Sequence, residues 1–279
     1  MNRFKNILVY SDASLRSRIA LERAAALAEE NLAQVTVLSV VEELPRELLQ
    51  LGAAVDSVEL WELAMKERRE KLDRLVRRIT FPHGGSIVKV LSGTPVFEII
   101  KEVLRQNFDL VMMMADGAGG FREALFGSIS KDLMRKCPCP VWVMKAARRK
   151  RYARILAAVD LVAAGDEHHS LNVKIVELAG SLARMEGSEL HLVHAWMPGF
   201  KGTWFDDLTA KRHVVKGLAS EVIPSLALKL GVDAIVMGTV CRTGVPGLLI
   251  GNTAEKVLQS VSCAVLTVKP EGFVSPVEV

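Results

Sequence analysis

An apolar run, a glycine-rich loop and the start of a helix follow one another in residues 108–130, FDLVMMMADGAGGFREALFGSIS. Residues 108–114 have the short aliphatic character of a strand that is buried on both faces of a sheet. The segment Gly117–Gly120 then leaves main-chain amides uncovered, and Gly127 and Ser128 open a helix. Uncovered amides and a helix N-terminus together attract anions. This order of elements predicts a parallel α/β fold with an anion site after a strand.

The same pattern occurs twice in the chain. Residues 7–12 (ILVYSD) recur 148 positions later as residues 155–160 (ILAAVD), and residues 35–41 recur 155 positions later as residues 190–196. Five further residues recur 124 positions later, namely Gly93, Asp109, Gly127, Cys139 and Lys145 as Gly217, Asp233, Gly251, Cys263 and Lys269. Such a repeat predicts two copies of one domain. The predicted parts are a first domain at 1–146, a basic linker at 147–153, a shortened second domain at 154–270 and a tail at 271–279.

Each copy is predicted to alternate five strands with four helices. In the first copy the strands are expected near 5–11, 34–41, 86–91, 108–114 and 140–145, and the helices at 14–30, 55–79, 95–107 and 125–136. Strands that alternate with helices predict a parallel sheet with right-handed crossovers. Ligands of such sheets bind at the carboxyl ends of the strands, where Asp12 is expected to lie beside the fourth strand.

The second copy has lost thirty-one residues between its second and third strands. Only Met197–Arg212 separates these strands, and this segment contains Pro198, Gly199 and Gly202, so that a full crossover helix barely fits. We therefore expect one apolar face of the second sheet to lack its helix. Such a face needs a cover. The expected candidates are Trp204 and Phe205, the tail 271–279, or a partner chain.

Composition places the chain among globular intracellular proteins. Half of its 279 residues are hydrophobic, the formal net charge is +4, and the 4 cysteines are too few for a disulfide framework. There is no secretory leader and no apolar run of membrane-spanning length, so we expect a cytoplasmic protein. The basic run around residues 148–154 is read as a solvated linker, against a phosphate- or membrane-contacting patch. No nucleic-acid partner is expected, because the charge is mild.

These motifs resemble the universal stress protein family. That family has an Asp at the end of strand one, Gly-x2-Gly-x9-Gly-Ser/Thr after strand four, and commonly Cys-Pro-Val at strand five, which here is Cys139-Pro140-Val141. The resemblance covers both copies, and residues 235–257 (IVMGTVCRTGVPGLLIGNTAEKV) look most like the tandem E-type members. It implies two Rossmann-like domains of the adenine nucleotide alpha hydrolase-like type, each with strand order 3-2-1-4-5. It also implies ATP as a candidate ligand of the first domain.

Carried over position by position, the resemblance gives a candidate nucleotide site in each copy. The residues are Asp12, Val40, Met114, Gly117, Gly127, Ser128 and Ser130 in the first copy, and Asp160, Gly238, Gly251 and Asn252 in the second. Both copies depart from the motif. Met114 replaces the first glycine of copy one, whereas Cys241 replaces the second glycine of copy two and Asn252 replaces its hydroxyl residue. If either copy holds a ligand in the family manner, we expect it to be the first.

Other chemistry finds little support in the sequence. His191 and His194 are three apart on a predicted strand, so they face opposite ways and cannot both bind one ion without distortion. We interpret them as core or surface histidines, against a zinc site. Cys137-Pro138-Cys139 lacks the CxxC spacing of thioredoxin-like proteins. No nucleophile has an identifiable base, so we expect no enzyme activity.

The family habit implies pseudo-twofold pairing of the two copies through strands 140–145 and 263–268. A homodimer of the whole chain is a further candidate assembly. Two roles stay open, a stress-response ligand sensor and a ligand-free interaction scaffold that uses the shortened face of the second copy.

Overall fold

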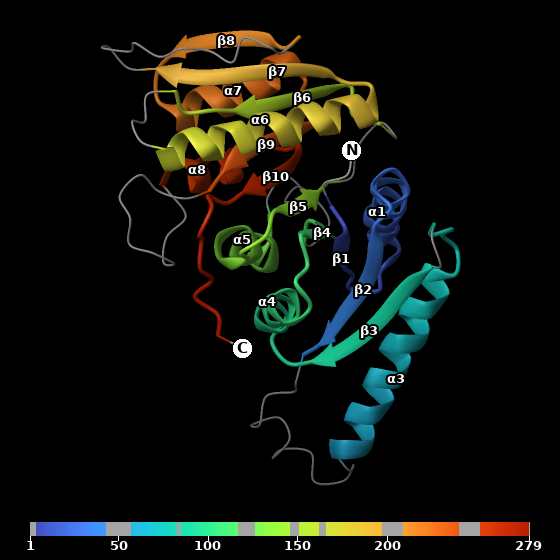
Figure 1. Cartoon of the computed structure of the whole chain (residues 1–279). Helices are drawn as coiled ribbons and strands as arrows, with labels where there is room; N and C mark the ends of the chain where they lie inside the picture. Colours follow the sequence, from blue (N-terminus) through green and yellow to red (C-terminus); the bar gives the residue numbers. More distant parts are fainter. Residues whose placement is uncertain are drawn as a thin grey trace. The chain divides into compact units, whose positions relative to one another are not determined.

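A computed structural model of the chain describes residues 4–42, 57–82, 85–116, 126–145, 151–161, 166–196, 209–239 and 252–278 (Figure 1). The chain forms two compact units. Unit one comprises Met1–Met114 and Val277–Val279, and unit two comprises Ala115–Pro276. The division between the units falls after the fourth strand, so the last helix and strand of the first copy belong to unit two.

Unit one contains a parallel sheet with the strand order β3-β2-β1-β4. Its elements are β1 (Asn6–Tyr10), η1 (Leu15–Ser17), α1 (Arg18–Asn31), β2 (Gln34–Val41), α3 (Ser57–Val76), β3 (Ser86–Ser92), α4 (Pro95–Gln106) and β4 (Leu110–Met114). The predicted order 3-2-1-4 is confirmed. The strands are aliphatic because they are covered on both faces, and β4 is buried along its whole length.

Helices of unit one lie on both faces of this sheet. Arg68 of α3 reaches Ser39 of β2, while Glu102 of α4 pairs with Lys89 of β3 at 2.5 Å. Ser39 and Lys89 point to opposite faces, because the residue level with Lys89 in the ladder is Leu38. Helix α3 therefore covers one face and α4 the other, and Figure 1 shows α3 running along β3.

Unit two contains a six-stranded sheet with the order β5-β10-β9-β6-β7-β8. Its elements are α5 (Ser128–Lys136), β5 (Val141–Met144), β6 (Arg154–Ala158), α6 (Asp166–Glu186), β7 (Glu189–Trp196), β8 (Lys211–Lys216), α7 (Ala219–Leu230), β9 (Ala234–Gly238), α8 (Asn252–Ser260) and β10 (Ala264–Val268). The second copy thus has the complete predicted order 3-2-1-4-5. No helix among the described residues is long and apolar enough to cross a membrane.

The two copies meet where β5 and β10 run antiparallel. Val143 lies level with Val265, and Trp142 with Leu266, in an otherwise parallel sheet. This confirms the predicted pairing of strands 140–145 and 263–268 within one chain. The contact is reciprocal, because the lysine after each strand caps the last helix of the other copy. Lys145 donates to the Val261 carbonyl at 2.7 Å after α8.

Lys269 makes the matching contact at the end of α5. Its ammonium donates to the carbonyls of Met134 at 2.8 Å and Arg135 at 2.9 Å. The last carbonyls of a helix have no partner within the helix, so each lysine satisfies groups that would otherwise be unpaired.

The predicted loss of the crossover helix between β7 and β8 falls on residues 197–208, which lie outside the described residues, as do Trp204 and Phe205. The strand that follows is described. Gly238 faces α6, where an added Cβ would meet Leu171, and the ladders place Arg212, Val214 and Lys216 on that same face.

The face of β8 has a different character from its counterpart in the first copy. The positions that correspond to Arg212, Val214 and Lys216 are Val88, Val90 and Ser92, on the face that α3 covers. In β8 all three side chains are exposed, and two carry charge. The expected apolar face is therefore charged at this strand, which suits contact with water.

Candidate functional site

Asp12 follows β1 and holds the turn that leads into η1. Its Oδ1 accepts hydrogen bonds from the Ser14 amide at 3.0 Å and the Ser17 hydroxyl at 2.7 Å. Burial disfavours the charged carboxylate. The hydrogen bonds from Ser17 and Ser14, together with the charge of Arg68, outweigh that effect and hold the pKa of Asp12 below its ordinary value. Asp12 is thus an ionised group already engaged by its own loop.

Val40 lies near the carboxyl end of β2 and is buried. The resemblance gives this residue the place beside an adenine. Arg68, from the middle of α3, donates through Nη1 to the Val40 carbonyl at 3.3 Å and to the Ser39 hydroxyl at 3.2 Å. The main-chain acceptor at this place therefore already has a donor. Met114 ends β4 with its side chain buried.

The N-terminus of α5 carries the clearest feature of the candidate site. Asp116 lies two residues after β4, and its carboxylate caps the helix. Oδ2 accepts the Ile129 amide at 2.8 Å, and Oδ1 accepts the Ser130 amide at 2.9 Å. The Ser130 hydroxyl also donates to Oδ1. The amides that the motif would offer to phosphate are therefore occupied by a carboxylate of the same chain.

Gly127 is the N-cap residue of α5 and has ordinary backbone angles, with φ −72°. A Cβ at this position would overlap both the carbonyl oxygen and the carboxylate of Asp116. This close approach explains the glycine without a ligand. Ser128, the next motif residue, is exposed at the start of the helix. Gly117 lies outside the described residues.

In the second copy, Asn172 and His194 contact the main chain of the turn that follows β6. Asn172 of α6 accepts the Asp160 amide at 3.0 Å and donates to the Asp160 carbonyl at 2.6 Å. His194 is buried at the end of β7, where its Nδ1 lies 3.4 Å from the Leu161 amide. Gly238 ends β9 against Leu171.

Two predicted residues of the second copy remain partly or wholly undescribed. Gly251 lies outside the described residues. Asn252 begins α8.

The structure thus brings Asp116, Gly127 and Ser130 together, whereas Asp12, Val40 and Met114 belong to the other compact unit. Three residues of the site were not predicted from the sequence, namely Asp116, Arg68 and Asn172. An acidic residue directly before a glycine-rich loop that leads to a helix was the available signal for Asp116, since such residues favour helix N-termini.

Other candidate groups are packed rather than reactive. Burial raises the pKa of the Cys263 thiol to about 12. Cys137 and Cys139 are buried, and their Sγ atoms lie 3.5 Å apart as thiols rather than a disulfide. His191 and His194 do face opposite sides of β7, toward α7 and α6 respectively. Within the described ranges no three His, Cys, Asp or Glu side chains converge as metal ligands would.

Comparison with known proteins agrees with this fold. The Universal stress protein family matches residues 3–145 and 205–269. Over its full length the chain is 29% identical to Universal stress protein E of Escherichia coli (strain K12), of which it covers 98%. It is also 27% identical to Universal stress protein E of Photorhabdus laumondii subsp. laumondii, of which it covers 99%.

A solved structure shows the same arrangement. The crystal structure of a functionally unknown protein from Pseudomonas aeruginosa PAO1 matches 98% of this chain and 95% of its own, with a TM-score of 0.73 and 27% identity. Because the family match spans well over half of the residues and both copies, the chain belongs to the universal stress protein family, as a tandem protein similar over its whole length to Universal stress protein E.

Proposed function

We propose that the chain is a cytoplasmic, non-enzymatic stress-response protein that acts through protein contacts and does not hold ATP in its first copy. Three observations support the parts of this proposal. The amides at the α5 N-terminus are already capped, the Asp12 carboxylate after β1 holds its own loop, and Asn172 of α6 holds the main chain of Asp160 after β6.

The contact between Asp116 and α5 carries the proposal. A phosphate that approached the amides of Ile129 and Ser130 would have to displace the carboxylate that already accepts both. Two like charges about 4 Å apart repel by about 1 kcal/mol in water and about 4 kcal/mol near a protein surface. The contact between Arg68 and the Val40 carbonyl acts in the same direction, because it occupies an acceptor that an adenine would use.

Calorimetric titration with ATP and Mg²⁺ tests the nucleotide part. We expect no binding heat from the wild-type protein up to high-micromolar ATP. The Asp116→Asn variant removes the negative charge from the helix N-terminus at nearly constant volume, so we expect it to gain measurable affinity. Asp132→Asn is the matched control, because Asp132 lies in the same helix but pairs with Lys136. Micromolar binding by the wild type that Asp116→Asn leaves unchanged would support ATP as the ligand of the first copy instead.

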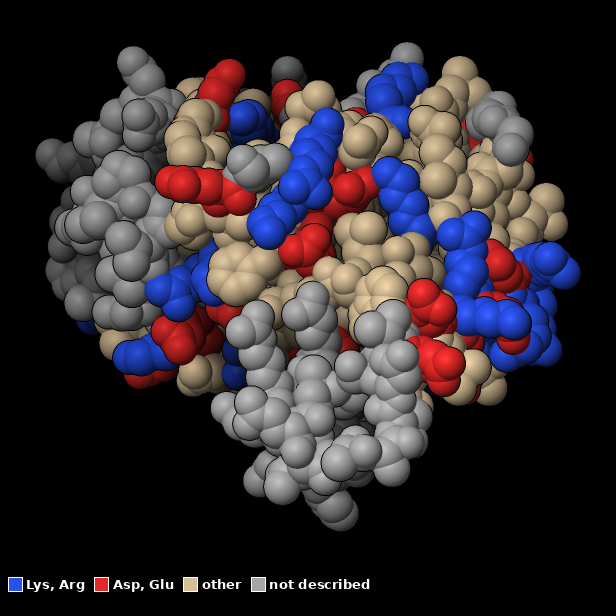
Figure 2. Space-filling view, turned by 90° about the horizontal axis from the view of Figure 1, so that it is seen from below, with Lys and Arg blue, Asp and Glu red and all other residues tan. Residues whose placement is uncertain are grey.

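The contact surface that we assign is the exposed face of β8, formed by Arg212, Val214 and Lys216. Arg212 and Lys216 suit an acidic partner, and the face in the first copy that corresponds to it is covered by α3. The molecular face drawn in Figure 2, which is seen from below Figure 1 and is not the face of β8, carries both signs of charge interspersed, rather than the single basic patch that is typical of nucleic-acid binders.

A photo-reactive residue at position 214 tests this surface in cells. We expect many intermolecular adducts at position 214 and few at position 228. Leu228 lies on α7, outside the assigned surface, and is the control because it is more exposed than Val214, at 82% against 46%, so that random collisions would favour it. Equal adduct yields at both positions would contradict a specific surface on β8. Adducts with the mass of two chains would identify the partner as a second copy of this protein, which tests the predicted homodimer.

A further inference from the structure

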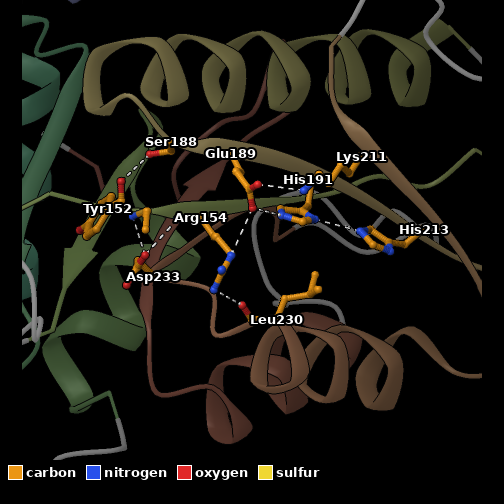
Figure 3. Close-up of polar contacts among 10 residues, drawn as sticks. Tyr152, Arg154, Ser188, Glu189, His191, Lys211, His213, Leu230 and Asp233 are labelled. Atoms are coloured by element: carbon orange, nitrogen blue, oxygen red, sulfur yellow. Dashed lines mark hydrogen bonds and ion pairs between the residues drawn. The ribbon is translucent and has the colours of Figure 1, made fainter.

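Two histidines form a direct contact between β7 and β8, at the amino ends of the strands and away from the candidate site. Nδ1 of His191 lies 2.9 Å from Nε2 of His213, and the rings are nearly parallel, with centroids 5.2 Å apart (Figure 3). His191 is only 3% exposed. Its other ring nitrogen makes no hydrogen bond and lies 3.5 Å from a carboxylate oxygen of Glu189.

A separation of 2.9 Å between two ring nitrogens requires one hydrogen between them. In the neutral pair one ring donates and the other accepts through its lone pair. A first added proton leaves this bond in place, because one accepting nitrogen remains. A second proton converts both rings to imidazolium, so that neither nitrogen accepts and the two cations repel each other. The contact between His191 and His213 therefore holds only while the pair carries fewer than two added protons.

Burial and the cations around the pair oppose that second proton, whereas Glu189 favours it on His191. Glu189 is the only carboxylate that Figure 3 shows at the pair, and it is shared with Lys211 at 2.8 Å and Arg154 at 3.3 Å. Lys229 of α7 acts on His213 from the facing helix. Burial lowers the pKa of both histidines. Glu189 partly offsets this effect on His191. Lys211 lowers the pKa further in both, and the neighbouring His191 does so for His213.

The histidine pair joins the edge strand β8 to the rest of the sheet of unit two. Strand β8 ends the sheet of unit two and pairs with β7 alone among the described strands. Four of its six side chains are exposed, so few apolar contacts hold it. Edge strands with charged side chains and little buried area open at low cost.

We propose that His191 and His213 form a pH-operated latch on the edge strand β8, closed while the pair carries at most one added proton and open when both rings are charged. This device goes beyond the proposed function. Its sign follows from the lowered pKa values. Above about pH 6.5 both rings are neutral in the folded and unfolded chain, and the contact stabilises β8 fully. As the pH falls below that value, the unfolded strand takes up protons that the folded pair resists, so the stabilisation declines.

Hydrogen exchange of the β8 amides at pH 7.5 and pH 5.0 tests the latch, with rates corrected for the intrinsic effect of pH. We expect the protection of residues 211–216 to fall by up to roughly tenfold, the effect of losing one intramolecular hydrogen bond, while that of β6 and β9 stays constant. The His213→Gln variant keeps a side chain that hydrogen-bonds but does not titrate, so we expect the acid effect to vanish. His169→Gln is the matched control, because His169 is an exposed histidine on α6, and it should retain the acid effect.

A second measurement covers the case in which His213→Gln fails to fold. Imidazole resonances of the wild-type protein should titrate in two steps, both below the ordinary histidine pKa, and the lower midpoint should coincide with the loss of β8 protection. Constant β8 protection down to pH 5.0, a loss shared evenly by all strands of unit two, or an acid effect that persists in His213→Gln would each overturn the latch.

Discussion

At the scale of single residues, the helix cap formed by Asp116 requires the glycine at position 127. The carboxylate of Asp116 reaches the amides of α5 only because the residue at the N-cap has no side chain. Gly127 has backbone angles that any residue adopts, so space rather than conformational freedom requires the glycine. A family motif residue thus has a structural reason that needs no ligand.

The close approach of Gly127 to Asp116 predicts the effect of Gly127→Ala. The added methyl group would overlap Asp116, so α5 or the chain before it must shift, and overpacking of this kind costs about 1–3 kcal/mol. Urea unfolding should show that loss. Ser128→Ala, one residue further and exposed, should change stability by less than about 0.5 kcal/mol. Equal stability of Gly127→Ala and the wild type would show that the loop adapts freely.

The repeated aspartates illustrate how a recurring residue acquires a role from the fold. Asp109 accepts the amides of Lys5 and Asn6 at 2.5 and 3.1 Å, and so holds the start of β1. Asp233 accepts the amides of Ala153 and Arg154 at 2.7 and 3.0 Å at the start of β6. The repeat revealed the pair in the sequence. Only the strand register shows that both are structural.

At the scale of elements, the reciprocal lysines tie the last helix of each copy to the last strand of the other. Lys269 is the better connected of the two, because its ammonium reaches two carbonyls of α5 and the Thr239 hydroxyl. Replacing it by a residue of similar length and no charge isolates these hydrogen bonds.

We expect Lys269→Met to lower the free energy of unfolding by about 1–3 kcal/mol, since it leaves buried carbonyls at the end of α5 unpaired. Lys71→Met, in the exposed pair of Lys71 with Glu67 on α3, should cost less than about 1 kcal/mol. Urea denaturation of both variants measures the difference. A Lys269→Met protein as stable as the wild type would show that these hydrogen bonds contribute nothing net.

The same variant has a pH signature. Burial lowers the pKa of Lys269 to about 7 and that of Lys145 to about 8, from 10.5. Between these values and 10.5, the unfolded chain binds protons that the folded chain has released, so stability rises with pH. The wild type should therefore resist urea better at pH 9 than at pH 7, and Lys269→Met should lose part of that gain.

At the scale of the whole molecule, the sequence predicted the architecture because repetition and strand patterning are local signals. The predicted strand 34–41 coincides with β2, and 140–145 contains β5. Pairing of the two last strands was expected from family habit. The structure confirms it within one chain and shows that the strands run antiparallel. The repeat and the strand patterns thus predicted the order of the strands and helices correctly.

The contacts of the candidate site were not predictable in the same way. Asp116 meets amides that lie 13 and 14 positions further along the chain, and Arg68 reaches Val40 across a helix whose rotation depends on packing. The pairing of His191 with His213 depends on the register between β7 and β8. Such contacts depend on how the elements pack against one another, which the spacing of residues in the sequence does not determine.

The pairing of β5 with β10 has a consequence for synthesis on the ribosome. Translation adds about 5–20 residues each second, and the partner of β5 is completed about 120 residues after β5 itself. For about 6–25 seconds at these rates, the edge of β5 that faces β10 thus exists without its partner, and the end of α5 exists without the Lys269 cap. The nascent chain carries an open strand edge during this interval, when neighbouring ribosomes on the same message bring identical edges close together. Efficient production of this tandem protein therefore depends on β10 pairing with β5 of its own chain before a strand of another nascent chain does.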